Sequence, residues 1–118
     1  MSDGMKIEKS SNVSKCAVEV EGAKDVHIRW LISKEDGAEN FAMRMFELQP
    51  GGHTPLHTHP HEHEVFIIEG QGLFIYEGQE YEFSPEYVIF VPGGKEHQFR
   101  NTGNSVLRIL CLIPAAAV

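Results

Sequence analysis

The chain has 118 residues, of which 42% are hydrophobic, and its formal net charge is −7. This length suits one domain with a single core. The negative charge argues against nucleic acids and anionic membranes as partners, because both favour basic surfaces. No run reaches the roughly 18 apolar residues of a membrane helix, and the first residues lack the apolar segment of a signal peptide. We therefore expect a cytoplasmic protein.

The N-terminal residues read differently from the rest of the chain. Residues 1–12 are expected to form a tail, flexible or partly derived from an expression vector, and residues 13–118 a single domain. The two cysteines, Cys16 and Cys111, are too few for a disulfide framework. In a reducing compartment both are expected to be free thiols.

Strand signals then follow one another, separated by Gly, Pro or Asn at short intervals. The expected strands are residues 13–20, 24–32, 40–48, 63–69, 73–77, 81–83, 87–91, 97–101 and 106–113. The tight turn at 70–72 predicts a hairpin between its two flanking strands, and 50–52 and 92–94 are expected to be turns. No stretch shows the period of an amphipathic helix. The chain is therefore expected to be an all-β sandwich or barrel.

A histidine-rich segment lies between the turn at 50–52 and the strand at 63–69. His57, His59, His61 and His63 occur within seven residues. On a strand His57 and His59 share a face, and Pro60 favours a strand end and a short turn before His63. Imidazoles brought to one point bind transition metals. The alternative is a solvated histidine-rich loop.

The spacing around these histidines resembles the first motif of the cupin superfamily. Gly51 is followed after five residues by His57 and His59, and His63 lies six residues before Gly70. The family most often has glutamate at the third ligand position. Only His63 has the required gap to Gly70, and the adjacent Glu64 points to the opposite face of a strand. The resemblance therefore implies His63 as the ligand, with Glu64 directed away.

A second motif follows in the expected order. The segment 92–94 reads Pro-Gly-Gly, His97 follows after two residues, and Asn101 follows after three more. The glycine that usually opens this motif is replaced by Glu86. Together the motifs cover about residues 40–114 and imply a double-stranded β-helix, or jelly-roll barrel, of the cupin 2 conserved barrel type. The chain is most similar to small single-domain cupins in which four histidines bind manganese or another divalent metal.

This resemblance implies a metal site. The implied ligands are His57, His59, His63 and His97, and the implied cofactor is one divalent transition metal per chain. Manganese or iron is favoured, with zinc, nickel and copper as alternatives because imidazole suits all of them. His61 is interpreted as a residue at the mouth of the pocket rather than a fifth ligand.

Other candidates each have a simpler interpretation. Arg44 is either a buried cation aimed at a substrate carboxylate or an outward, solvated arginine. Cys111 either lines the pocket, open to oxidation near a metal, or is a small core residue. Phe99 is a candidate for an apolar wall. His27 and His53 are expected to be surface or packing residues.

Three functions are compatible with the sequence. The first is an enzyme that acts on a small anionic or chelating molecule by dioxygenase-like oxygen chemistry. The second is a metal-anchored module that binds or senses such a molecule, and the third is a purely structural metal site. A homodimer is expected, with the segment 13–32 pairing across a two-fold axis.

Overall fold

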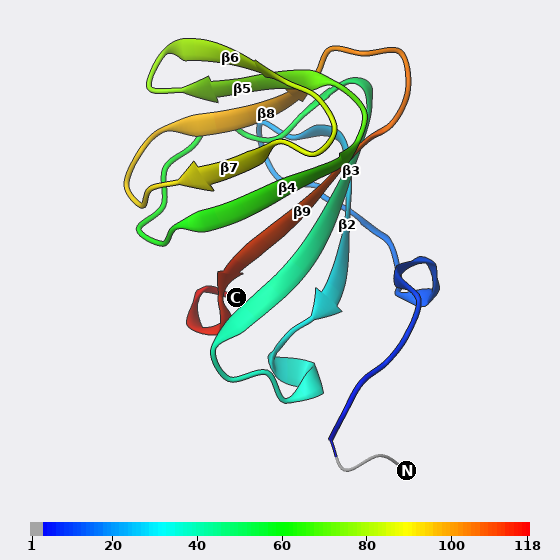
Figure 1. The fold of residues 1–118 in the computed structure, drawn as a ribbon. Helices are drawn as coiled ribbons and strands as arrows, with labels where there is room; N and C mark the ends of the chain where they lie inside the picture. The colour runs from blue at the N-terminus through cyan, green and yellow to red at the C-terminus, as the bar shows by residue number, and fades with distance from the viewer. Residues whose placement is uncertain (1–3) are drawn as a thin grey trace.

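A computed structural model of the chain describes residues 4–118 (Figure 1). Residues 1–3 of the expected tail lie outside the described residues. Nine strands of the described part form one sheet: β1 Cys16–Ala17, β2 Lys24–Ile32, β3 Phe41–His53, β4 His63–Glu69, β5 Gly72–Tyr76, β6 Gln79–Phe83, β7 Val88–Val91, β8 His97–Asn101 and β9 Leu107–Pro114. Short 3-10 helices occur at η1 Ser10–Asn12, η2 Lys34–Asp36 and η3 Ala115–Ala117. The expected all-β fold is confirmed.

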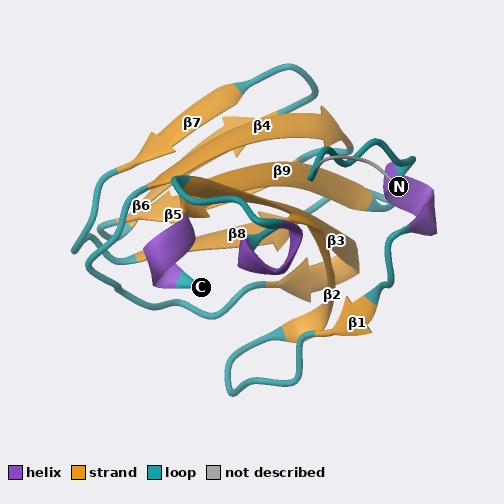
Figure 2. Ribbon diagram, turned by 90° about the horizontal axis from the view of Figure 1, so that it is seen from below, coloured by secondary structure: helices purple, strands orange, loops and turns teal. Residues whose placement is uncertain are grey.

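The sheet curls on itself, with strand order β6-β5-β8-β3-β9-β4-β7 and with β2 and β1 attached beside β3 (Figures 1 and 2). All pairings are antiparallel. One half contains β5, β6 and β8, and the other contains β2, β9, β4 and β7. The long strand β3 reaches both halves, since it pairs with β9 along residues 41–48 and with β8 at His53.

The expected turn at 50–52 is wrong, because β3 continues through it. Leu48 pairs with Val26 and His53 with Lys24, so the intervening segment forms an irregularity in the β3 edge rather than a chain reversal. Gly51 has φ 82°, a left-handed conformation that glycine adopts without strain. The resulting bend carries β3 from one half of the sheet to the other.

The predicted hairpin between 63–69 and 73–77 is also wrong. Strand β4 pairs with β7 and β9, whereas β5 pairs with β6 and β8. The short connection between β4 and β5 carries the chain into the opposite half of the sheet. Gly70 has φ 92°, and a Cβ atom there would lie 2.7 Å from the Cα atom of Leu107. The backbone therefore crosses close over the start of β9.

The N-terminal segment forms less strand than expected. Only Cys16–Ala17 of the predicted strand 13–20 is regular, and it pairs with β2. Arg29 donates hydrogen bonds to the carbonyl oxygens of Ser11 and Val13, so this segment packs against the outside of β2. Pro114, expected to end the last strand, is its final residue.

Alternation along the strands separates a closed interior from the outside. In β9, Leu107, Ile109, Cys111 and Ile113 are buried, while Arg108 lies outside and forms ion pairs with Glu47 and Glu69. Because side chains alternate between the two faces of a strand, the same pattern decides which polar side chains enter the interior.

Candidate metal centre

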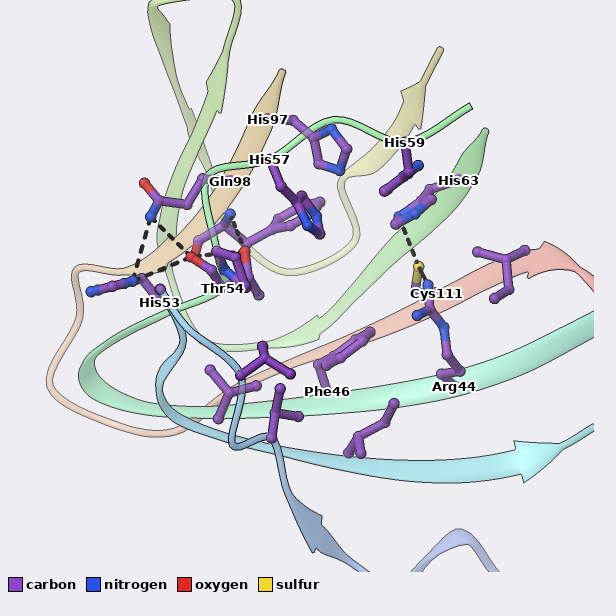
Figure 3. A pocket seen from close by; sticks show the side chains of 18 of the residues that line it. Arg44, Phe46, His53, Thr54, His57, His59, His63, His97, Gln98 and Cys111 are labelled. Carbon is purple, nitrogen blue, oxygen red and sulfur yellow. Dashed lines mark hydrogen bonds between the residues drawn. The ribbon is translucent and has the colours of Figure 1, made fainter. Parts of the chain in front are cut away.

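Two strand starts and one loop supply the histidines at one end of the interior (Figure 3). His63 opens β4 and His97 opens β8, and both are buried. His57 and His59 lie in the irregular segment between β3 and β4, not on the strand that the sequence suggested. The backbone of His57 is tied to that of His97 by two hydrogen bonds of 3.0 and 3.2 Å.

The loop at 92–94 holds this segment from the other side. The Gly94 N–H donates to the His59 carbonyl oxygen at 2.7 Å. A Cβ atom at Gly93 would overlap the carbonyl oxygen of Pro60. Glycine is therefore needed for this close approach between the two motifs.

The four predicted ligand rings lie close together. The His59 ring centroid lies 4.4 Å from that of His63, 4.8 Å from that of His97 and 5.1 Å from that of His57. The ligand atoms of His57, His59 and His97 lie within 4.8 Å of one another. A second such group joins His59 and His63 to His61, whose ring stacks on His59 at 3.9 Å.

Hydrogen bonds on the outer ring nitrogens orient these rings. The Nδ1 atom of His97 lies 2.8 Å from the Lys95 carbonyl oxygen, and that of His59 lies 2.9 Å from the His61 carbonyl oxygen. A carbonyl only accepts, so Nδ1 carries the proton and Nε2 keeps its lone pair. The Nε2 atoms of His59, His63 and His97 are buried and have no hydrogen-bond partner among the described residues. This donor set fits a transition metal ion, which would satisfy all three atoms.

Burial and neighbouring charges favour the neutral form of His57, His63 and His97. Burial, and then the nearby Arg44 charge, lower the pKa of His63 to about 2. Burial, and then the other histidines, lower the pKa of His57 to about 4. Burial also lowers the pKa of His97. Neutral imidazole is the form that binds metals.

The rings open into a cavity of about 1160 Å³. Its wall is mostly apolar and comes from strands of both halves of the sheet, with contributions from Ile28, Trp30, Phe46, Phe99, Ile109 and Ile113. The part of the wall from β2 was not foreseen, although the alternation of Val26, Ile28 and Trp30 was a signal that one face of this strand points inward.

The three pocket candidates all line this cavity. Arg44 points inward, and its guanidinium lies 2.9 Å from the sulfur of Cys111. Cys111 is 1% exposed, and its sulfur lies 3.3 Å from Nδ1 of His63. Burial raises the pKa of the Cys111 thiol. Phe99 is buried against Phe74 and Phe83.

Other polar residues occupy the surroundings of the centre. Glu64 is exposed on the face opposite to His63. His53 is half-buried, and its Nδ1 lies 3.4 Å from Nε2 of Gln98. Gln98 also donates to the Thr54 carbonyl oxygen at 2.9 Å, a contact that sequence reasoning missed because both residues occupy variable positions of the motifs.

A family model described as "Cupin domain" matches residues 44–113. The chain belongs to the cupin family. Several solved structures share the cupin fold. The polyketide cyclase RemF from Streptomyces resistomycificus is 34% identical and has a TM-score of 0.89, with 94% of this chain and 80% of that chain covered.

Curated relatives of this cupin differ in their names. The oxalate-binding protein of Thermotoga maritima is 34% identical over 96 residues, which cover 78% of each chain. The 1-methylthio-D-xylulose 5-phosphate methylsulfurylase of Rhodospirillum rubrum is 36% identical over 73 residues. That match covers 62% of this chain and 47% of the relative, so the chain spans about half the length of that protein.

Proposed function

We propose that this cupin binds one divalent transition metal through His57, His59, His63 and His97. The observation that carries the proposal is a set of three buried Nε2 atoms, at the end of a large cavity, that have no hydrogen-bond partner within residues 4–118. Manganese or iron is favoured among the metals that imidazole accepts. When bound, such an ion supplies a Lewis acid, and for iron or manganese a redox centre, for an oxygen-bearing substrate.

The proposed substrate is an extended, mainly apolar organic molecule with a chelating pair of oxygen atoms. A cavity of about 1160 Å³ is larger than a dicarboxylate such as oxalate requires. The aromatic and aliphatic wall favours an apolar body of the size of a polyketide, the class named for RemF. The apolar wall would orient the substrate body and exclude bulk water from the histidine end.

Oxygen-dependent chemistry is the proposed reaction class. Among the described residues that line the cavity, the carboxylates are those of Glu19 and Glu21, both of which are exposed. The interior therefore offers no carboxylate base for proton abstraction, which disfavours reactions that depend on one. Ring closure is the second candidate, and the 34% identity to a polyketide cyclase favours it.

Metal analysis and oxygen uptake test these proposals. Protein purified without a metal-affinity column should contain about one transition metal ion per chain. Chelator treatment should remove the ion. With an ortho-hydroxynaphthoate as a probe, uptake at an oxygen electrode would support oxygen chemistry. Consumption of a linear polyketide without uptake would favour ring closure, and binding of either compound without turnover would favour a sensing module. A metal-free preparation that cannot be reloaded would contradict the metal site.

We also propose an oligomeric state and a cellular location. We infer a homodimer, because β2 has an open edge beyond its short pairing with β1 and because apolar side chains on β4 and β7 are exposed. A cytoplasmic location is supported by Cys16 and Cys111, which are both free thiols. No helix among the described residues is long and apolar enough to cross a membrane.

A further inference from the structure

Arg44 lies in the cavity and forms no ion pair with any of the described residues. Among the described residues that line the cavity it is the only arginine or lysine. Its one hydrogen-bond partner within residues 4–118 is the sulfur of Cys111, a weak acceptor, and its Nε atom is buried without a partner. Guanidinium carries five N–H donors, so most of them remain available. An unpaired cation in an apolar cavity is costly unless a ligand compensates it.

The position of this guanidinium is fixed by rigid neighbours. Arg44 stands directly opposite Trp30 on β2 and Cys111 on β9 in the strand register. Its guanidinium carbon lies 4.9 Å from the Phe46 ring centroid and 5.7 Å from the Trp30 ring centroid. Aromatic faces at these distances attract a cation and hold its planar group in place. The guanidinium is therefore already oriented to donate hydrogen bonds to a planar acceptor.

Arg44 also lies close to the histidine end of the cavity. The sulfur of Cys111 contacts both the guanidinium, at 2.9 Å, and the His63 ring, at 3.3 Å (Figure 3). One small molecule can therefore reach the histidines and the guanidinium together.

We propose that Arg44 binds a carboxylate of the substrate, so that the ligands of this cupin are aromatic or polycyclic organic acids rather than neutral phenols. This inference rests on the proposed function, because it takes the histidine end as the reacting end. A carboxylate matches the fork of the guanidinium, and the surrounding rings match an aromatic body. The carboxylates of Glu19 and Glu21 are exposed, so water screens their repulsion of an incoming anion.

Calorimetric binding of two matched probes tests the proposal. An ortho-hydroxynaphthoate and the corresponding ortho-hydroxynaphthamide share the ring body and the hydroxyl group but differ in charge. In chelator-treated wild-type protein the acid should bind roughly 10- to 100-fold more tightly than the amide. Arg44→Gln should reduce that ratio to about one. Arg44→Lys should retain part of it, because the charge remains while the planar fork is lost.

Arg100→Gln is the matched control, because Arg100 is exposed on β8 and does not line the cavity. It should leave the ratio unchanged. Equal binding of acid and amide by folded wild-type protein, or a full preference retained in Arg44→Gln, would overturn the proposal. Metal content is measured on the same preparations before chelator treatment and again after the metal is added back. If the Arg44-dependent preference appears in a chain that binds no metal, the proposed function fails and this inference stands.

Discussion

At the scale of single residues, contacts at the Nδ1 atoms orient three histidines of the centre. Backbone carbonyls accept from His59 and His97, whereas His63 contacts the thiol of Cys111. Such contacts fix the tautomer and direct the opposite nitrogen into the site. The backbone therefore orients His59 and His97, and the Cys111 side chain orients His63. Substitutions can distinguish the metal ligands from the residues that orient them.

His63→Ala should reduce metal affinity more than 100-fold, since it removes one of four proposed ligands. His61→Ala is the control, because His61 also lies within reach of His59 and His63 but is interpreted as a mouth residue. Competition with a chromogenic chelator measures both variants. Equal losses would show that His61 is a ligand.

Cys111→Ala should weaken metal binding by about tenfold, because the His63 ring loses its contact at Nδ1. Cys111→Ser should restore most of the affinity, since a hydroxyl can take the same place. Cys16→Ser, at the exposed cysteine, should have no effect. An unchanged dissociation constant in Cys111→Ala would show that the backbone alone orients His63.

The lowered histidine pKa values predict acid sensitivity of the metal-free protein. Unfolded histidine takes up a proton near pH 6.5, whereas folded His57 and His63 resist until about 4 and about 2. Below pH 6.5 the unfolded state therefore binds more protons than the folded state. As a result, the free energy of unfolding decreases as the pH is lowered. The slope is up to about 1.4 kcal/mol per pH unit for the buried His63 and smaller for the exposed His57, because solvent screens its interactions. Urea unfolding from pH 7 to 4 should show a shallower slope for His63→Gln.

At the scale of elements, contact between two loops assembles the centre. The loop at 92–94 touches the histidine segment through Gly93 and Gly94, and His57 pairs with His97 at the start of β8. The first motif brings three of the proposed ligands and the second motif brings His97, so neither motif can form the site alone. Correct packing of the loops should therefore matter as much as the ligands themselves.

Gly93→Ala should destabilise the fold by about 1–3 kcal/mol, because its Cβ atom would overlap the Pro60 carbonyl oxygen. The same displacement should weaken metal binding through His59. Gly103→Ala is the matched control, since its Cβ atom would meet Asn101 at an ordinary 3.6 Å. Thermal unfolding of both variants, with and without metal, measures the difference. Similar melting temperatures for both would argue against a tight loop contact.

At the scale of the whole molecule, the curled sheet has an apolar outer face beside its edge. Val88 is 76% exposed and Phe90 58% exposed on β7, and Phe66 and Ile68 of β4 lie next to them. Exposed apolar groups of this kind are typical of protein–protein contacts. This face is an alternative to the N-terminal segment as the site of dimer contact.

Light scattering at micromolar concentration should give the mass of a homodimer. If the outer face forms the contact, Phe90→Lys should convert the dimer to a monomer, because a buried unpaired charge opposes association. Glu64→Lys is the control, since Glu64 is exposed beside Phe90 and is already charged. A monomeric wild-type protein would refute the dimer, and a dimeric Phe90→Lys would favour the N-terminal segment.

The local properties of the chain were predictable from its sequence. The bounds of β2, β4 and β8 agree with those expected, and the jelly-roll fold and the cupin family are confirmed. Strand alternation and turn residues act over a few positions, so they are readable without knowledge of the partner strands. The spacing of the histidines is likewise local, except that His97 comes from a separate motif.

Only the tertiary structure decided which strands pair and which face of each is inside. The turn after β4 leads into the opposite half of the sheet, and β3 continues through Gly51 because long-range pairing outweighs the local turn signal. For Arg44, the alternation of side chains along the strand was equally consistent with an inward and an outward position. Packing against Trp30, Phe46 and Cys111 places it inside. The cavity and its cation follow from contacts between distant strands, and such contacts leave no local signal in a single sequence.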